Sequence, residues 1–440
     1  MKPIAAITLL WGLSAGPFIC YAQEQAGTQG QTPEHARYTV TDLGTLGGSY
    51  SYGYGINDAG VVSGGAATPA QSGGVSQTAF LWVRGHFFNL GTLDGLACPD
   101  CSSEAGGPNA WGESPILSET SDPAHKNEDF CGFGTHRQCL GAIWRNGKMT
   151  ALPTLRGGQN SQAYWINNEG QVVGFAENGT SDSTCSSSVP FQVRRFEPVI
   201  WGRNGEIHEL RPLPGDTVGF AFGINDKGQA VGSSGLCSNT SLPPVSAKGP
   251  HAVLWERDGS PTDLGNLGGT ISNIATTVND PGDVVGTSQL TDGTVHAFLW
   301  TRAKGMRDLG TLPGAVETVP PCCNTLNDRG EVAGFSIDAT GNMRAFFWRN
   351  GVMSDLNDLS PDSPLYLLAA SSINDAGEIA GFGVNSDGDV HAFLATPNRR
   401  VAVTDSFSPA AQRPMVLPEN VRELVQQRLG FGRYGLIGPH

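Results

Sequence analysis

The sequence is poor in charged residues and poorer still in cations. Only 15% of its 440 residues are charged, and 27 Lys and Arg stand against 41 Asp and Glu, for a formal net charge of -14. Nucleic-acid binding depends on clustered Lys and Arg, so a nucleic-acid partner is excluded. The chain also shows no paired nucleophile and base, no metal-ligand cluster and no phosphate loop. The sequence therefore assigns no catalytic, cofactor-binding or metal residue, no cofactor, and favours a binding protein over an enzyme.

Long apolar runs are missing as well. Beyond the first residues, no segment approaches the roughly 18 uninterrupted apolar residues of a membrane-spanning helix, so no membrane span is expected. The N-terminus has Lys2, an apolar run over residues 4–16 and small residues before Gln23, a pattern typical of a secretory signal peptide. We predict a signal peptide over 1–22, a linker over 23–37, and export to the extracellular space or the periplasm.

Removal of Cys20 with the signal peptide leaves an even number of cysteines in an oxidising compartment, which predicts disulfides ahead of free or metal-bound thiols. A local bond is favoured in "CPDC". If the long loops described below lie over adjacent repeat units, the next two cysteines would close a short loop, and the fifth and sixth would link neighbouring loops. The last two are adjacent and bond either to each other or elsewhere. The candidates, in this order, are Cys98, Cys101, Cys131, Cys139, Cys185, Cys237, Cys322 and Cys323.

Sixty glycines and 28 prolines indicate many turns and short strands. Three sequence blocks, each found seven times with some worn copies, organise them: "AFLW", "INDAG" and "DLGTLGG". A worn second block over 102–114 fills the gap in the second unit. Successive first blocks lie roughly 45 to 62 residues apart, a spacing typical of propeller or solenoid repeats. The first blocks end at Trp82, Trp144, Trp201, Trp255, Trp300, Trp348 and Ala395.

Each unit has the pattern of four short strands, as in "ATTVN", "DVVGTS", "HAFLW" and "MRDLG", joined by turns rich in Asn, Asp and Gly. Four antiparallel strands per repeat predict an all-β propeller, most simply of seven blades, over 38–397. Residues 38–43 would close the ring beside 392–395 and leave no free sheet edge. The alternative is that 401–405 completes the last blade itself.

"HAFLW" at His296, "HAVLW" at His251 and "HAFLA" at His391, with their companion blocks, resemble the HAF (His-Ala-Phe) repeat of bacterial extracellular proteins. The resemblance covers about 38–397 and implies a secreted repeat protein, without an activity or catalytic residues to transfer. The chain departs from the repeat at the histidine, whose seven positions are Thr78, Leu140, Glu197, His251, His296, Arg344 and His391.

This column argues against a ring of metal-binding histidines, because Leu140 and Arg344 cannot be ligands of such a ring. It favours a structural or surface role for the histidines. The six tryptophans, each at the same place in an apolar strand, are predicted to pack between neighbouring blades.

The long segments 113–139, 175–196 and 233–250 are assigned to the loop between the second and third strands of units two, three and four, and all eight cysteines fall in these loops or in the crossings between units. Long loops on a rigid scaffold are common binding surfaces. The alternative is that these loops are insertions that the fold tolerates and that have no function. The tail, 398–440, contains a predicted amphipathic helix over 418–429 that docks on the propeller or mediates assembly.

Three functions follow from the sequence. The first is a secreted scaffold for binding or adhesion, whose partner is an unknown extracellular protein or polysaccharide. The second is a polysaccharide lyase or glycosidase with acids meeting in a propeller funnel, for which Glu113, Glu119 and Asp122 are the loop candidates. The third is a structural component of the envelope.

Overall fold

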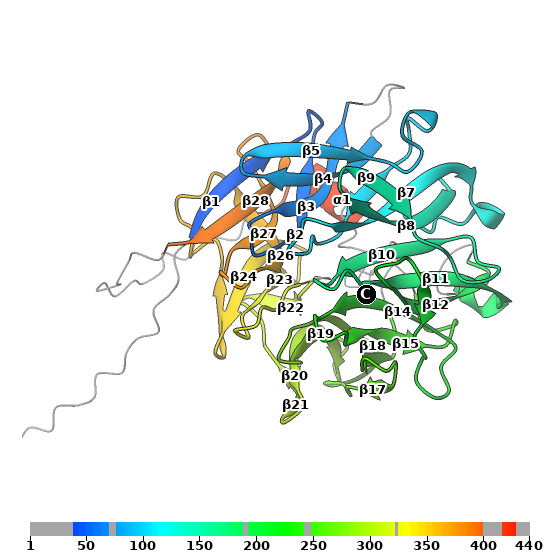
Figure 1. Ribbon diagram of the computed structural model, residues 1–440. Helices are drawn as coiled ribbons and strands as arrows, with labels where there is room; N and C mark the ends of the chain where they lie inside the picture. The colour runs from blue at the N-terminus through cyan, green and yellow to red at the C-terminus, as the bar shows by residue number, and fades with distance from the viewer. Residues whose placement is uncertain are drawn as a thin grey trace, which may run out of the picture. The chain divides into compact units, whose positions relative to one another are not determined.

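The computed structural model describes residues 38–69, 76–187, 192–241, 248–321, 324–398 and 416–427. Within these residues the chain forms seven four-stranded antiparallel sheets that follow one another around a ring, which is a seven-bladed β-propeller (Figure 1). The predicted fold class is confirmed, and the worn second unit is a complete blade. The signal peptide, the linker, Cys322, Cys323 and 401–405 lie outside the described residues.

The blades run from the innermost strand outward. Blade 1 is β2 (Ser51–Ile56), β3 (Val62–Thr68), β4 (Ser76–Val83) and β5 (His86–Gly91); blade 2 is β6 (Ser103–Ala105), β7 (Ser114–Pro123), β8 (Arg137–Arg145) and β9 (Lys148–Ala151). Blade 3 is β10 (Ser161–Ile166), β11 (Val172–Ser181), β12 (Arg194–Trp201) and β13 (Ile207–Glu209); blade 4 is β14 (Val218–Ile224), β15 (Ala230–Gly235), β16 (His251–Trp255) and β17 (Pro261–Asp263).

The remaining blades follow the same order. Blade 5 is β18 (Gly268–Val278), β19 (Val284–Leu290), β20 (Val295–Thr301) and β21 (Gly305–Asp308); blade 6 is β22 (Ala315–Val319), β23 (Val332–Asp338), β24 (Met343–Arg349) and β25 (Val352–Asp355). Blade 7 is β26 (Tyr366–Ile373), β27 (Ile379–Val384), β28 (Val390–Pro397) and, from the other end of the chain, β1 (Tyr38–Gly44).

The ring is closed by the N-terminal strand. β1 is the outer strand of blade 7 and pairs antiparallel with β28 from Tyr38 opposite Pro397 to Gly44 opposite Ala392. The closure predicted for residues 38–43 is therefore confirmed. Because the first and last strands of the propeller share one sheet, a ladder of backbone hydrogen bonds joins its two ends.

Neighbouring blades pack through apolar side chains of the inner and third strands. The repeated tryptophans belong to these cores: Trp201 and Trp255 are fully buried, Trp300 and Trp348 are buried, and Trp82 and Trp144 are partly buried against the same kind of cluster. The indole N–H groups of Trp201 and Trp255 donate to the carbonyl oxygens of Pro153 and Arg211, so burial leaves neither N–H without an acceptor.

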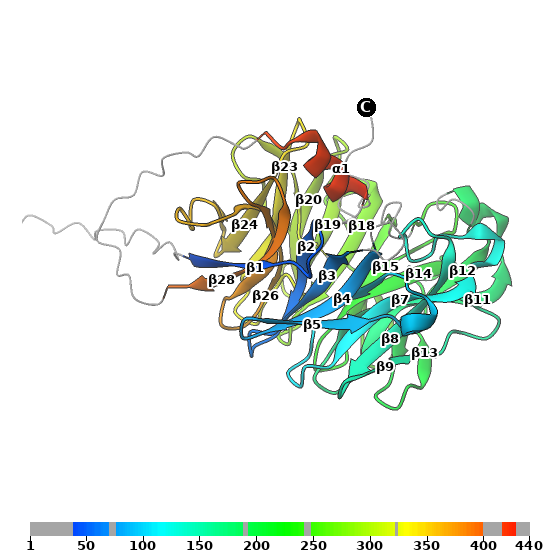
Figure 2. The ribbon, with the colours of Figure 1, turned by 90° about the horizontal axis from the view of Figure 1, so that it is seen from above.

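Antiparallel strands place the turns of each blade on two opposite faces. The mouth face carries the turns between first and second strands; the crown face carries the loops between second and third strands and the crossings between blades. A single α-helix is described, α1 (Glu419–Gln427), which agrees in position with the predicted helix and lies outside the sheets (Figure 2). Val421 and Val425 share a hydrophobic cluster with Phe335 and Met343, and the Leu417 amide donates to Asn342 in the crown of blade 6.

Candidate functional site

The mouth face carries a closed ring of hydrogen bonds between asparagines. In every blade the side-chain amide of the turn asparagine donates to the backbone carbonyl oxygen of the matching asparagine in the next blade, at 2.8 to 3.3 Å. The amide of Asn374 in blade 7 donates to Asn57 in blade 1, which completes the circle. The members are Asn57, Asn109, Asn167, Asn225, Asn279, Asn327 and Asn374.

The turn sequence explains why asparagine is needed here. While its amide group reaches the next blade, the Oδ1 of Asn57 accepts the backbone N–H groups of Ala59 and Val61 and so holds its own turn. The turn glycines of all seven blades have φ between 73° and 94°, a conformation that side chains disfavour. Sequence analysis assigned these Asn-Asp-x-Gly blocks to hairpin turns and missed their second role between blades.

A second layer of the mouth is formed by the residue after each asparagine. In six blades the Oδ1 of this residue accepts the backbone N–H of the corresponding residue in the preceding blade, at 2.7 to 2.9 Å. The layer borders an axial cavity of about 130 Å³. Its members are Asp58, Ala110, Asn168, Asp226, Asp280, Asp328 and Asp375.

This layer places five carboxylates on one arc, from blade 4 through blade 7 to blade 1. Blade 3 contributes the amide oxygen of Asn168 instead, and Ala110 in blade 2 has no side-chain acceptor. Burial raises the pKa of Asp328, and the negative charges of Asp375, Asp280 and Asp58 raise it further. Beside Ala110, Trp111 is 73% exposed, and its indole N–H donates to the carbonyl oxygen of Asn168 at 3.2 Å. Each Oδ1 on the arc serves a neighbouring backbone amide, so the arrangement first of all ties the turns together.

The crown face carries three disulfides, Cys98–Cys101, Cys131–Cys139 and Cys185–Cys237. They are the pairings predicted above, the first two as local bonds and the third as a link between neighbouring loops. The first lies in the crossing from blade 1 to blade 2, the second closes the crown loop of blade 2, and the third joins the crown loops of blades 3 and 4. These bonds brace four adjacent blades on one face.

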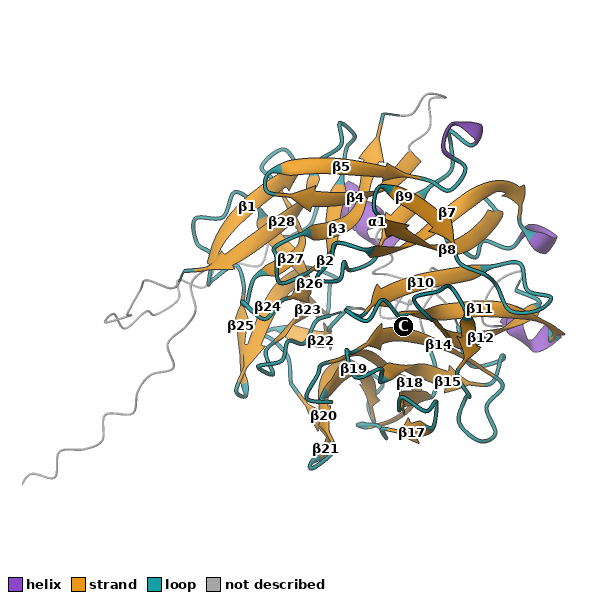
Figure 3. Cartoon of the chain, in the orientation of Figure 1, coloured by secondary structure: helices purple, strands orange, loops and turns teal. Residues whose placement is uncertain are grey.

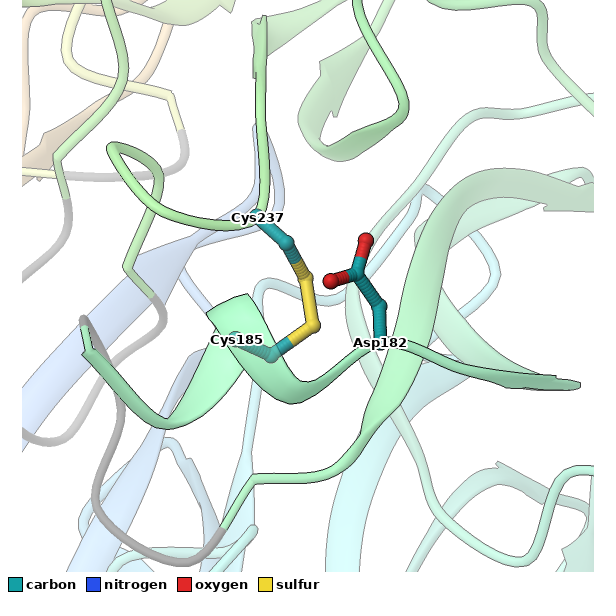
Figure 4. A group of neighbouring side chains, drawn as sticks. All are labelled: Asp182, Cys185 and Cys237. Carbon is teal, nitrogen blue, oxygen red and sulfur yellow. A yellow bond between two sulfur atoms is a disulfide. The ribbon is translucent and has the colours of Figure 1, made fainter.

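Asp182 lies beside the Cys185–Cys237 disulfide, and the three side chains form a compact group (Figure 4). With the sulfur atoms bonded to each other, no thiolate is left to bind a metal. The Asp182 carboxylate forms an ion pair with Arg195 at 3.0 Å and accepts hydrogen bonds from the hydroxyl and amide groups of Thr184. These donors lower the pKa of Asp182, first of all the Thr184 hydroxyl. The group is a structural link with a satisfied carboxylate.

A buried polar network joins the crown loops of blades 2 and 3. Glu128 and Glu177 are 1% and 0% exposed, and the side-chain amide of Asn160 donates to both, at 3.1 Å each. Burial raises the pKa of Glu128 to about 8, with the charge of Glu177 adding to the effect. Sequence analysis missed this pair, because the two glutamates belong to different blades and no spacing links them.

The acids proposed from sequence do not converge. Glu113 directly precedes β7 and lies on the mouth side, bound to Arg145 and Arg203, which corrects its assignment to a crown loop. Glu119 is fully buried and accepts hydrogen bonds from the amide of Ser102 and the hydroxyl of Thr135, whereas Asp122 is exposed. The loop predicted over 113–139 starts later than expected, since β7 extends to Pro123.

The histidine column of the repeat has a partner in the "DLG" block. His296 Nδ1 lies 3.0 Å from both carboxylate oxygens of Asp308, and His391 Nδ1 lies 2.9 Å from Oδ2 of Asp42. In blade 6 an arginine replaces the histidine, and Arg344 pairs with Asp355 of the "DLG" position at 3.1 Å. In blade 4 the histidine has a different partner, since His251 pairs at 2.8 Å with Asp216 of the crossing from blade 3.

No protein-family model matches the sequence, and no curated protein matches it. Among solved structures the chain is similar to virginiamycin B lyase from Staphylococcus aureus, with 10% identity over 82% of this chain and 99% of that chain and a TM-score of 0.46. It is also similar to puromycin hydrolase, with 13% identity over 83% of this chain and 56% of that chain and a TM-score of 0.48. At such identities a likeness concerns the fold alone. In the part of the chain that the structure describes, no helix has the length and apolarity needed to cross a membrane.

Proposed function

We propose that this chain is an exported recognition scaffold that binds an extracellular protein or polysaccharide through the disulfide-braced crown of blades 1 to 4. The observation that carries the proposal is the placement of the three disulfides on one face over adjacent blades. Cross-linked loops on a rigid ring keep their shape before a partner arrives, which reduces the entropy lost on binding.

Export is supported by the chemistry of the same bonds. Disulfides persist in oxidising compartments and are rare in the cytosol, and the N-terminal 22 residues have the pattern of a secretory signal. The resemblance to the HAF repeat of bacterial extracellular proteins supports the same location. We assign the chain to that group as part of this proposal.

Binding is favoured over catalysis by the state of the crown acids. Glu128 and Glu177 are crown carboxyl groups that approach one another, but both are buried and held by protein donors, so a polymer on the crown surface does not reach them. A glycosidase needs two carboxyl groups that flank the scissile bond of a bound sugar.

The proposal is tested by incubating the oxidised mature protein with insoluble polysaccharides and with bacterial envelope fractions, and by measuring bound protein and released sugar ends. Two crown variants, Leu96→Asp and Leu236→Asp, change side chains that are 94% and 42% exposed and lie close to disulfides. Trp111→Ala on the mouth face is the matched control.

Binding without sugar release, weakened roughly tenfold by the crown variants and unchanged in Trp111→Ala, supports the proposal. Sugar release would replace it with the enzyme function. Binding that is lost only in Trp111→Ala would move the recognition surface to the mouth face.

A further inference from the structure

Two buried acidic side chains, Glu128 of blade 2 and Glu177 of blade 3, lie next to each other where these blades meet. Glu128 lies in the crown loop of blade 2, directly after the 3-10 turn η2 (His125–Asn127), and Glu177 lies on β11 of blade 3. Both contact one amide group, since the Nδ2 of Asn160 donates to Oε2 of each. The two carboxyl groups are therefore close neighbours in a site closed to solvent.

The donors around the pair are divided unequally. Oε2 of Glu177 accepts the backbone amides of Gln159 and Asn160 at 3.3 and 3.0 Å, and Oε1 accepts the side-chain amide of Gln192 at 2.9 Å. Among the described residues, Glu128 accepts N–H hydrogen bonds from two groups, the backbone amide of Val193 at 3.3 Å and the side chain of Asn160. Because N–H donors stabilise an ionised carboxylate, this division of donors favours a proton on Glu128.

The charged groups around the pair do not compensate two anions. Arg194 NH1 lies 4.0 Å from Oε2 of Glu177, and His125 Nδ1 lies 3.9 Å from Oε1 of Glu128. Burial lowers the pKa of His125, and the charges of Arg194 and Lys126 lower it further, so this imidazole is neutral at neutral pH. One arginine thus faces two carboxyl groups, and a buried unpaired charge is costly.

We propose that one proton shared by Glu128 and Glu177 locks the crown loop of blade 2 onto blade 3, and that loss of this proton releases the loop. When both groups are ionised, their repulsion and the lack of water destabilise the contact between them. The contact can then be broken by movement of Glu128 but not of Glu177. Glu177 is fixed in β11, where it pairs with Phe196 of β12, whereas Glu128 lies on a loop. The Cys131–Cys139 disulfide and Phe130, which is buried against Phe175 and whose carbonyl oxygen accepts the side-chain amide of Gln162, hold the second half of that loop. The segment that moves is therefore residues 124–129.

The lock is tested by hydrogen exchange at about pH 6 and about pH 9 on the full oxidised protein, read from peptides over 119–137 and 177–187. Peptides from β20 to β24 correct for the dependence of exchange chemistry on pH. A carboxyl group whose pKa is about 8 when locked and has the ordinary value of 4.5 when released predicts a fall in protection of roughly 10- to 100-fold between the two conditions.

Glu128→Gln is the decisive variant. Its amide group offers Glu177 a donor without a charge, so protection at about pH 9 stays at the value measured at about pH 6. Glu177→Gln leaves Glu128 as a single buried carboxyl group. Burial still raises the Glu128 pKa while the repulsion from Glu177 is removed, so this variant is expected to lose less protection than the wild type between the two pH values, and it provides a second measurement if the first variant folds poorly. Glu206→Gln, whose side chain is 64% exposed and lies in a mouth-face turn of blade 3, is the control and retains the wild-type loss.

Equal protection of the wild type at both pH values would overturn the lock, as would a Glu128→Gln variant that loses protection as the wild type does. No ligand enters the measurement, so its outcome is independent of whether the crown binds the partner proposed above.

Discussion

Blades 2 to 4 and blades 5 to 7 share the same four strands and the same ring of turns, but their crowns are built differently. In the first group the second and third strands are joined by the long loops 124–136, 182–193 and 236–250, and in the second group by the short turns 291–294, 339–342 and 385–389. The short helical turns η1 (Gly95–Ala97), η2 and η3 (Ser183–Ser187) all lie beside the long-loop blades (Figure 3).

Each group also holds its outer strands in its own way. In blades 5, 6 and 7 a histidine or arginine side chain at the start of the third strand pairs with an aspartate on the fourth, namely His296 with Asp308, Arg344 with Asp355 and His391 with Asp42. In blade 3 the same place has Glu197 near Glu209, and burial together with this second negative charge raises the pKa of Glu197 to about 8. In blades 5 to 7 a side-chain pair thus joins the two outer strands, whereas the long loops of blades 2 to 4 carry disulfide bonds.

The largest expected effect is removal of the bond between blades 3 and 4. Cys185→Ala combined with Cys237→Ala removes a link across 52 residues, and chain-entropy reasoning predicts a loss of about 4 kcal/mol in the free energy of unfolding. The same change at Cys131 and Cys139, 8 residues apart, is expected to cost about 2.5 kcal/mol. Denaturant unfolding measures both, and equal losses for the two bonds would contradict this account.

A smaller effect is expected from Arg344→Ala in blade 6. The Arg344 and Asp355 side chains are 12% and 10% exposed, so the variant leaves a mostly buried carboxylate without its cation and is expected to lose about 2 kcal/mol. Arg344→His restores the residue that blades 5 and 7 have at this place and is expected to recover at least half of the loss. Denaturant unfolding of both variants tests this, and a histidine variant no better than alanine would show that the column is not interchangeable.

The smallest effect concerns the His296–Asp308 pair and depends on pH. The hydrogen bond to Asp308 raises the pKa of His296 above its ordinary value of 6.5. The stabilisation is therefore complete below about pH 6.5 and is lost as the pH rises through the folded-state pKa. Asp308→Asn keeps an acceptor for the Gly310 amide and is expected to cost about 1 kcal/mol at about pH 6 and nearly nothing at about pH 9. A cost that is the same at both pH values would assign the effect to packing instead of charge.

The fold could be predicted from the sequence because each block recurs at a matching place in seven blades. Three of the four strands are marked in the sequence by Trp300 and its equivalents, by the turn asparagines and by the "DLG" segments. The N-terminal "YTVTDLG" precedes the first complete unit, so the last unit is the one that it can complete. The local disulfides could also be paired from the sequence, because Cys98–Cys101 and Cys131–Cys139 each join cysteines that are close together in the chain.

Contacts between strands and between blades could be predicted only in part. The sequence hinted at a pair between the histidine column and an aspartate, because Arg344 keeps the positive charge that histidine can carry in blades 5 and 7. Predicting the partner, however, requires the register of β24 and β25, which the sequence does not give. The Glu128–Glu177 pair left no signal in the sequence. Its two members are brought together by the packing of blades 2 and 3, and burial, which determines their protonation, is a property of the folded chain.

The asparagine ring has a consequence for the number of repeats. Every amide donates in the same rotational direction, and the last donor, on Asn374, finds its acceptor on Asn57. An open stack of the same repeats would end with one unused amide and one unused carbonyl group, so the circle gives each unit two identical neighbours and no terminal unit. Adding or deleting one unit would therefore change the angle between neighbouring blades at every junction of the ring. The number of repeats is thus fixed by all seven junctions together.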